Sequence, residues 1–302
     1  MRNRHFFKAN VLPVLAAAIW GTAFVAQSVC AGHLPPFTIN AIRSLIACAV
    51  LLPASHALEA AKRRRGIAVP PSPRRELLLG GVPAGLFLAV ATNLQQAALV
   101  DTAAGKAGFI TALYVVLVPV LGALLLRRRA SWRVWLAIAV AVAGLWLLCM
   151  HGSLSLRFSD LLLMLCALCF AGQILCIDRF ARGVDGIRFS GVEFLTAGVV
   201  SALLALAFES PTPAGLRACL WPLLYIALFS SCVAYTLQVI AQKEGDPTVV
   251  SLLMSLESVF AVLGGAVILG DRLSGREYLG CALMLAAVVL AQLPGKKEAR
   301  DP

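Results

Sequence analysis

The sequence predicts an all-α integral membrane protein whose ten transmembrane helices form two inverted-topology five-helix repeats. Three observations lead to this fold class. Of the 302 residues, 60% are hydrophobic and only 14% are charged, an apolar share far above that of soluble domains. Ten apolar runs follow one another along the chain, and a polar-bearing segment of the first half recurs in the second half.

Each apolar run is about 20 residues long, enough to cross the roughly 30 Å hydrocarbon core of a bilayer as a helix. Membrane β-strands would be about 10 residues long and strictly alternating, and the chain has no such pattern. The predicted spans of the first repeat, residues 1–150, lie near residues 10–30, 36–56, 77–98, 104–126 and 131–150. Those of the second repeat, residues 151–302, lie near residues 159–178, 186–208, 220–242, 247–269 and 274–293.

In the first half, the opening run follows MRNRHFFK and looks like a signal peptide. It is long for a signal-peptide core and a similar run recurs in mid-chain, so we expect it to persist as the first helix. The loop at residues 62–75 is basic, holds three prolines and is expected to be a flexible surface connector. In the fourth span, Pro119 lacks a backbone N–H and is expected to kink the helix.

In the second half, the sixth span carries Cys166, Cys169 and Cys176. A thiolate metal site there would lack polar support, so these residues are expected to be small core residues. Small residues that permit close helix contact occur as the pair Gly81 and Gly85 in the third span and as Gly264 in the ninth.

The repeat is visible without gaps over two hairpins that start at Ala91 and Ala234, at an offset of 234 − 91 = 143 residues. Such self-similarity must be found first, because it defines the architecture. The identical pairs include Leu94 and Leu237, Gln95 and Gln238, Ala98 and Ala241, Leu113 and Leu256, Val116 and Val259, and Gly122 and Gly265. The first two spans of each half align at 193 − 43 = 150 residues, which sets Trp20 against Phe170, Asn40 against Ser190, and Arg43 against Glu193.

An odd number of spans in each half means that the second half enters the membrane inverted relative to the first. Inverted repeats of this kind are typical of secondary transporters, whose binding site lies near the midplane between the halves. With the N-terminus inside, inner segments hold 20 of the 26 Lys and Arg residues and outer loops hold four. The positive-inside rule therefore predicts a multi-pass protein of the inner or plasma membrane with both termini in the cytoplasm. The net charge of +11 is interpreted as a topology signal, not as a sign of a nucleic-acid partner.

Polar residues recur on single faces of four spans. The predicted stripes contain Ser231, Tyr235, Gln238 and Gln242 in the eighth span, Thr92, Gln95, Gln96 and Asn93 in the third, Ser190, Glu193 and Ser201 in the seventh, and Asn40, Arg43 and Ser44 in the second. Singly, such residues can serve only to bond neighbouring helices. As a set at repeat-equivalent positions, they are expected to line a shared cavity.

Four ionisable residues fall within spans, where each costs about 2.5–3.5 kcal/mol at a helix centre. Lys106 lies near a span end and can reach the interface. Glu257 lies deep in the ninth span and is expected to act as a proton carrier or as a ligand of a substrate ammonium, or else to pair with Lys106 or Arg43. For Arg43 and Glu193, an ion pair between the halves and contact with substrate are both open.

Trp20 and Tyr114 are the aromatic candidates for the cavity wall, although aromatic residues in spans often only pack. Tyr114 is the repeat counterpart of Glu257, so the symmetry is broken there. The candidate cavity residues are therefore Trp20, Asn40, Arg43, Thr92, Gln95, Gln96, Tyr114, Glu193, Tyr235, Gln238 and Glu257.

Several catalytic and cofactor motifs are absent from the sequence. There is no GxxxxGK[ST], HExxH or GxSxG segment, and the four histidines are scattered. ATP hydrolysis is therefore not expected, and we expect no enzyme activity, no cofactor and no metal site.

The segment AAAIWGTAFVAQ in the first span and ILGDRLSGREYLGCALMLAAVVL at the junction of the ninth and tenth spans resemble the drug/metabolite transporter superfamily, in its EamA branch. The corresponding first-half junction contains Arg127, Arg128 and Arg129 and lacks the Gly270–Asp271 pair. The resemblance implies an inner-membrane, ion-coupled carrier, often an exporter of amino acids or related metabolites. It also implies a central cavity lined by helices 1–4 and 6–9, with helices 5 and 10 at the periphery.

The functional hypothesis is a secondary active transporter, an exporter of amino acids or related small metabolites that works by alternating access, with protons as the expected coupling ion. The expected partners are this small-molecule substrate, the lipid bilayer and protons. Two alternatives stay open at this point: an importer or facilitator of a small cationic metabolite, and a membrane scaffold or sensor that transports nothing.

Overall fold

The computed structural model describes residues 7–67, 72–102, 104–127, 130–149, 157–268 and 274–292, and every regular element within them is a helix. Within them, ten helical segments are long and apolar enough to cross a membrane, which confirms the predicted number of spans and the all-α fold class. The spans are Phe7–Ala31, Pro36–Arg64 (α3), Arg74–Ala98 (α4), Lys106–Leu126, Trp132–Cys149 (α7), Phe158–Gly183, Gly186–Phe208 (α9), Leu220–Glu244, Pro247–Gly264 and Gly275–Gln292 (α15). Five of them are built from more than one helix: η1 (Phe7–Val11) and α2 (Leu12–Ala31), α5 (Ala104–Ala112) and α6 (Tyr114–Leu126), α8 (Phe158–Phe180) and η2 (Ala181–Gly183), α11 (Leu220–Tyr225), η3 (Ile226–Ala234) and α12 (Tyr235–Glu244), and α13 (Pro247–Met254) and α14 (Glu257–Ile268). A short helix, α10 (Pro213–Ala218), precedes α11.

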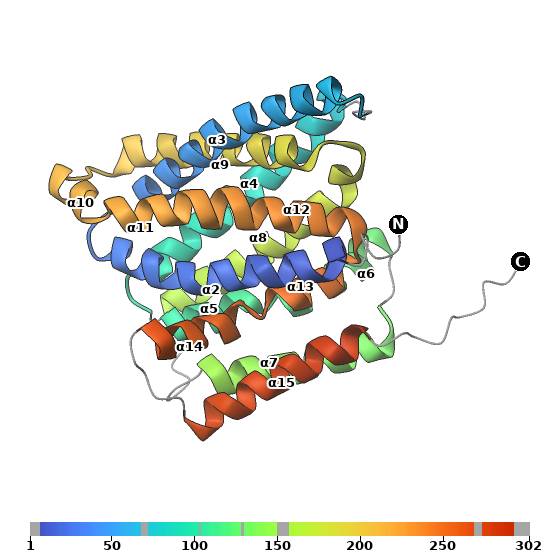
Figure 1. Ribbon diagram of the computed structural model, residues 1–302. Coiled ribbons are helices and arrows are strands. Elements are labelled where there is room, and N and C mark those ends of the chain that lie inside the picture. Colours follow the sequence, from blue (N-terminus) through green and yellow to red (C-terminus); the bar gives the residue numbers. More distant parts are fainter. Residues whose placement is uncertain are drawn as a thin grey trace, which may run out of the picture.

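The helices of the two halves interleave (Figure 1). The second span, α3, packs along the seventh, α9, and the fifth, α7, packs along the tenth, α15. The third span, α4, packs on the sixth, α8, while the first, α2, packs on the eighth through α11, η3 and α12. If the two halves are exchanged, the contacts between spans 2 and 7 and between spans 5 and 10 are unchanged, and the contact between spans 3 and 6 becomes the one between spans 8 and 1. The predicted repeat leads us to expect this pattern.

The pair α7 and α15 forms one edge of the bundle (Figure 1). The two helices approach closely at glycines: a Cβ on Gly144 would lie 3.0 Å from the carbonyl oxygen of Gly280. Small residues let helix backbones meet in a membrane, where dispersion contacts drive association. Helices 5 and 10 are thus peripheral, as the family resemblance implied.

The glycines of the third span serve contacts within the chain. A Cβ on Gly81 would lie 2.8 Å from Val192, and one on Gly85 would lie 2.5 Å from the backbone oxygen of Glu193. Both neighbours belong to α9, so the motif holds α4 against the second half.

The fourth and ninth spans are each interrupted at equivalent positions. The helix ladder breaks at Leu113, whose N–H bonds to the oxygen of Ile110 at 3.2 Å, and again at Ser255 and Leu256. The Ser255 hydroxyl donates to the backbone oxygen of Leu252 at 2.8 Å, a local bond that competes with the regular ladder. The kink was predicted at Pro119, but Pro119 lies inside α6 (Tyr114–Leu126), and the break falls about one and a half turns earlier.

These breaks make Tyr114 and Glu257 the first residues of α6 and α14 (Glu257–Ile268). The two are repeat counterparts, so both halves place a helix start at the same point. Interrupted helices in corresponding positions of the two halves are a known marker of transporter binding sites.

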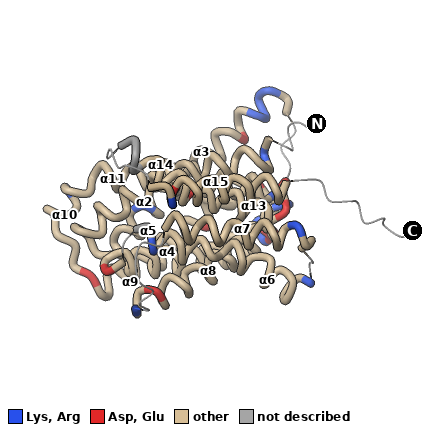
Figure 2. The backbone as a smooth tube through the Cα atoms, turned by 90° about the horizontal axis from the view of Figure 1, so that it is seen from below, with Lys and Arg blue, Asp and Glu red and all other residues tan. Residues whose placement is uncertain are grey.

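Basic residues gather at one end of the bundle, the end at which α2 begins and α15 ends (Figure 1 and Figure 2). This distribution agrees with the predicted topology, in which that end faces the cytoplasm. Several residues named above lie outside the described part of the chain: Arg128, Arg129, the Gly270–Asp271 pair and both chain ends.

Candidate functional site

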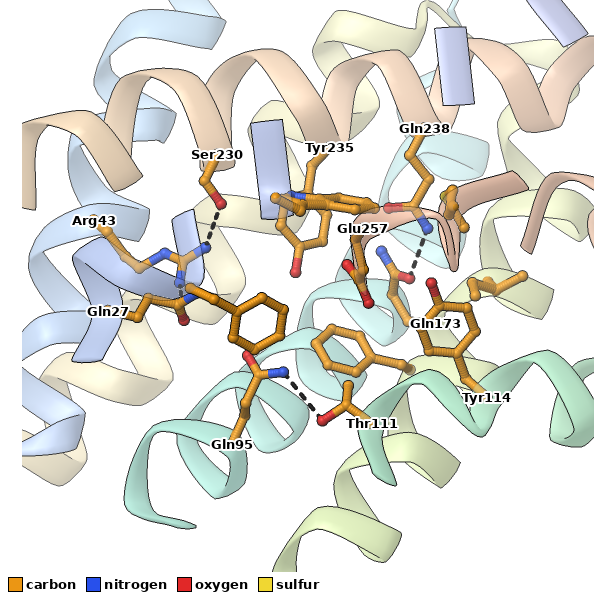
Figure 3. Close-up of a pocket in the computed structure, with 15 residues that line it drawn as sticks. Gln27, Arg43, Gln95, Thr111, Tyr114, Gln173, Ser230, Tyr235, Gln238 and Glu257 are labelled. Carbon is orange, nitrogen blue, oxygen red and sulfur yellow. Dashed lines mark hydrogen bonds between the residues drawn. The ribbon is translucent and has the colours of Figure 1, made fainter. Parts of the chain in front are cut away.

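A polar cavity lies in the middle of the bundle (Figure 3). Its volume is about 40 Å³, room for roughly three water molecules. The lining comes from both halves: Trp20, Phe24 and Gln27 of α2, Arg43 of α3, Gln95 of α4, Thr111 of α5, Tyr114 of α6, Phe170, Gln173 and Ile174 of α8, Ser230 of η3, Tyr235 and Gln238 of α12, Met254 of α13, and Glu257 of α14. Among the described residues, none from α7, α9 or α15 lines it. The resemblance implied a lining from helix 7 (α9) as well, and that helix instead stands behind the cavity wall.

Arg43 is the cation of the site and is 3% exposed. Its Nε donates to the Ser231 hydroxyl at 2.9 Å, Nη1 to Oε1 of Gln27 at 3.3 Å, and Nη2 to the Ser230 hydroxyl at 3.3 Å. Both serines belong to η3 (Ile226–Ala234), a π-helix, and π-helical turns are frequent at functional sites. All three acceptors are neutral, so the guanidinium is oriented, but no carboxylate among the described residues forms an ion pair with it.

Glu257 is the carboxylate of the cavity and is 5% exposed. In the part of the chain that the structure describes, no side chain or backbone N–H hydrogen-bonds to it and no cation pairs with it. The sequence left open a pairing with Lys106, but Lys106 bonds to Asp160 at 2.6 Å. Glu257 is therefore available to a ligand.

Hydrogen bonds through two side-chain amides connect the cavity to a second buried carboxylate. Gln238 donates to Oε1 of Gln173 at 3.1 Å, and Gln173 donates to Oε1 of Glu193 at 2.7 Å. Glu193 on α9 is fully buried behind Gln173 and does not line the cavity. The expected alternative of an ion pair between Arg43 and Glu193 is not formed.

Aromatic rings supply the apolar part of the wall. The Trp20 ring meets the Tyr235 ring edge to face with centroids 4.8 Å apart, and Phe194 supports Tyr235 from α9 at 5.3 Å. On the other side, Tyr114 packs against Phe170 at 6.4 Å. The rings hold one another in place, as aromatic pairs in this geometry do.

The structure divides the candidate residues into two groups. Trp20, Arg43, Gln95, Tyr114, Tyr235, Gln238 and Glu257 line the cavity. Asn40, Thr92, Gln96 and Glu193 do not. Asn40 donates to the oxygen of Thr92 at 3.0 Å, the Thr92 hydroxyl donates to Leu88 at 2.8 Å, and Gln96 donates to the oxygen of Gln27 at 3.2 Å. The side chains of Asn40 and Gln96 join helices, which was the alternative interpretation of the polar stripes, while the Thr92 hydroxyl bonds within its own helix α4.

Sequence reasoning missed several lining residues, and the repeat itself contained the signal for most of them. At the offset of 150, Trp20 corresponds to Phe170 and Phe24 to Ile174; at the offset of 143, Thr111 corresponds to Met254. Together with Gln95 and Gln238, and Tyr114 and Glu257, these are repeat-related pairs with both members in the cavity wall. Gln27, Gln173 and Ser230 have no such partner in the lining and could not be found this way.

The chain is similar to known transporters in sequence. The sequence model described as the EamA-like transporter family matches residues 7–150 and again residues 157–293. An uncharacterized transporter of Archaeoglobus fulgidus is 28% identical over 92% of this chain and 84% of its own. The uncharacterized inner membrane transporter YedA of Escherichia coli K12 is 26% identical over 94% of this chain and 92% of its own.

Two further similarities are more limited in what they support. The threonine/homoserine exporter RhtA of Salmonella typhimurium is 29% identical, but the match covers only 60% of this chain and 61% of RhtA. A protein of known crystal structure superposes with a TM-score of 0.73 over 94% of this chain and 96% of its own, at 23% identity. That likeness shows the fold alone.

Proposed function

Because the chain belongs to the EamA-like transporter family, it is a membrane transporter, and we propose that it is a secondary active exporter of amino acids or related small metabolites. The observation that carries this proposal is the central polar cavity, which both halves build and which contains an oriented cation and an unpartnered carboxylate. The relative named as a threonine/homoserine exporter supports amino acids as the substrate class.

Transport by alternating access is part of the proposal. All of the side chains that line the cavity except Trp20 are buried, so the helices must separate before substrate enters. The two halves would rock about an axis in the membrane plane, as inverted repeats do. The repeat-related pairs in the cavity wall support such an axis, and the predicted placement of both termini in the cytoplasm belongs to the same proposal.

Transport itself is the first test. The purified protein is reconstituted in liposomes and assayed for exchange of labelled amino acids across a panel that includes threonine and homoserine, with a pH-sensitive dye inside. We expect exchange of at least one amino acid, accompanied by proton movement when a substrate gradient is imposed. Vesicles that exchange no amino acid or related metabolite and move no protons would overturn the proposal.

A second candidate is import or facilitated passage of a small cationic metabolite. Glu257 favours it, because a buried carboxylate without a protein partner attracts a cation. The same vesicles distinguish the two functions: for the cationic alternative, amines are carried better than amino acids and passage follows the membrane potential.

If the cavity is the transport route, cysteines at Gln95 and Gln238 are expected to react with a water-soluble maleimide in intact vesicles, and bound substrate is expected to slow that reaction. The matched control is a cysteine at Val199, which is 45% exposed on the outer face of α9, a surface that faces lipid in the predicted topology. Labelling is measured by mass spectrometry against the unmutated chain. Equal labelling at all three positions would show that the polar residues do not mark a water-filled route.

A further inference from the structure

The cavity contains two buried charges of opposite sign that do not neutralise each other. Arg43 donates to Ser231, Gln27 and Ser230, all neutral, and each of its terminal nitrogens keeps a second hydrogen. Burying an ion without a counter-ion costs several kcal/mol. The residual charge and the free hydrogens of the guanidinium fork therefore suit an anion that the protein itself does not supply.

Glu257 presents the complementary situation. It begins α14, and the backbone of α14 is pressed against α2, since a Cβ on Gly21 would lie 2.6 Å from the Glu257 carbonyl oxygen. The close contact fixes where the carboxylate enters the cavity, while its oxygens have no donor within the described chain. It therefore suits a cationic donor.

The two charges lie on different sides of the cavity, with the Tyr235 ring located between them (Figure 3). Gln95, Gln238 and Gln173 complete the wall with groups that can donate or accept hydrogen bonds. The Trp20 and Tyr114 rings cover the apolar part. One wall region is thus positive, another is negative, and neutral amides and rings separate them.

We propose that this cavity selects zwitterions, with the substrate carboxylate bound by Arg43 and the substrate ammonium bound by Glu257. The inference rests on the proposed function, because it states which chemical feature of an amino acid the exporter recognises. A simple cation would leave Arg43 buried without an anion, and a simple anion would do the same to Glu257. A single ligand with both charges compensates both residues at once, and its carboxylate can bind the guanidinium fork through two parallel hydrogen bonds.

The test compares threonine with two analogues that each lack one charge: 1-amino-2-propanol, which has no carboxylate, and 2,3-dihydroxybutyrate, which has no ammonium. Inhibition of labelled amino acid exchange gives the apparent affinity of each. The wild-type protein is expected to prefer threonine to both analogues by at least about tenfold, since a lost hydrogen bond to a charged group costs about 1.5–3 kcal/mol. If the panel selects another amino acid, its own amine and 2-hydroxy acid replace the threonine set.

Two variants assign the charges. Glu257→Gln is expected to weaken threonine at least about tenfold and to leave 2,3-dihydroxybutyrate within about threefold of its wild-type affinity. Arg43→Gln is expected to remove the preference for threonine over 1-amino-2-propanol. Arg43→Lys keeps the charge but loses the fork. Its preference for threonine over 1-amino-2-propanol is expected to lie between those of the wild-type protein and Arg43→Gln, and it replaces Arg43→Gln if that variant does not fold. Asp101→Asn, at an exposed position outside the cavity, is the matched control and is expected to change none of the affinities.

The outcomes separate this inference from the proposed function. If the wild-type protein exchanges an amino acid but Glu257→Gln weakens the amino acid and its hydroxy analogue equally, the inference is overturned and the exporter assignment stands. A wild-type preference for 1-amino-2-propanol over threonine overturns the zwitterion in favour of a cationic substrate. If no amino acid is exchanged or bound at all, the inference is overturned; if no related metabolite is exchanged and no protons move either, the proposed function falls with it.

Discussion

Replacing Glu257 with glutamine is expected to abolish the response of transport to an imposed proton gradient. Glutamine keeps the shape of the side chain but can neither carry a proton nor balance a cation. Ionisable residues within membrane spans are costly and mark proton relays or substrate paths, and among the described residues Glu257 is the carboxylate that lines the cavity. Accumulation of substrate is therefore expected to fall to the level reached without a pH difference.

The measurement is accumulation of labelled amino acid in proteoliposomes as a function of the pH difference across the membrane. The titratable groups close enough to feel the charge of Glu257 are Tyr114, Tyr235, Cys149 and Cys166. Tyr114→Phe and Tyr235→Phe are therefore run in parallel and are expected to keep the pH response. If the Glu257→Gln variant shows the wild-type pH profile, Glu257 has no part in coupling.

The number of helices was predictable from the sequence because lipid imposes a strong constraint: about 20 apolar residues are needed per span. The polar cavity was predictable as a set, because buried polar residues at repeat-equivalent positions need a shared interior. The individual assignments were less secure. Asn40 and Thr92 lie on the predicted faces, yet Asn40 donates to the oxygen of Thr92 and neither reaches the cavity.

Two features depend on tertiary contacts and could not be derived from residue spacing. Gln173 stands alone in an apolar helix, so no stripe marked it, although it joins Gln238 to Glu193. Arg43 donates to two serines of η3. Ser231 belonged to a predicted stripe, but nothing in the sequence linked it or Ser230 to Arg43. The repeat suggested an ion pair between Arg43 and Glu193, but that pairing assumes that equivalent residues face each other, and here they face different neighbours.

A bulky residue at Gly21 is expected to damage both stability and transport, because this glycine is the point where α2 meets α14. A Cβ there would lie 2.6 Å from the Glu257 carbonyl oxygen, 2.7 Å from the Ala261 nitrogen and 2.7 Å from the Phe260 Cβ. Two of these atoms belong to the backbone and cannot turn aside, so the helices must separate. Overpacking of this kind costs about 1–3 kcal/mol, and the shift would move the carboxylate of Glu257 away from the cavity.

Gly21→Val is therefore expected to lower the thermal stability of the protein in detergent and to lose amino acid exchange, while Gly21→Ala gives a smaller loss of both. Gly108 provides the matched control, because a Cβ there would meet nothing within 4 Å; Gly108→Ala is expected to be neutral or to stabilise the helix by about 0.4–1 kcal/mol. Stability is measured by the loss of monodisperse protein on heating and exchange by counterflow in liposomes.

Close contact between α2 and α14 is dispensable if Gly21→Val keeps wild-type stability and exchange. If Gly21→Val keeps its stability but loses exchange, the contact matters for positioning Glu257 and not for holding the bundle together.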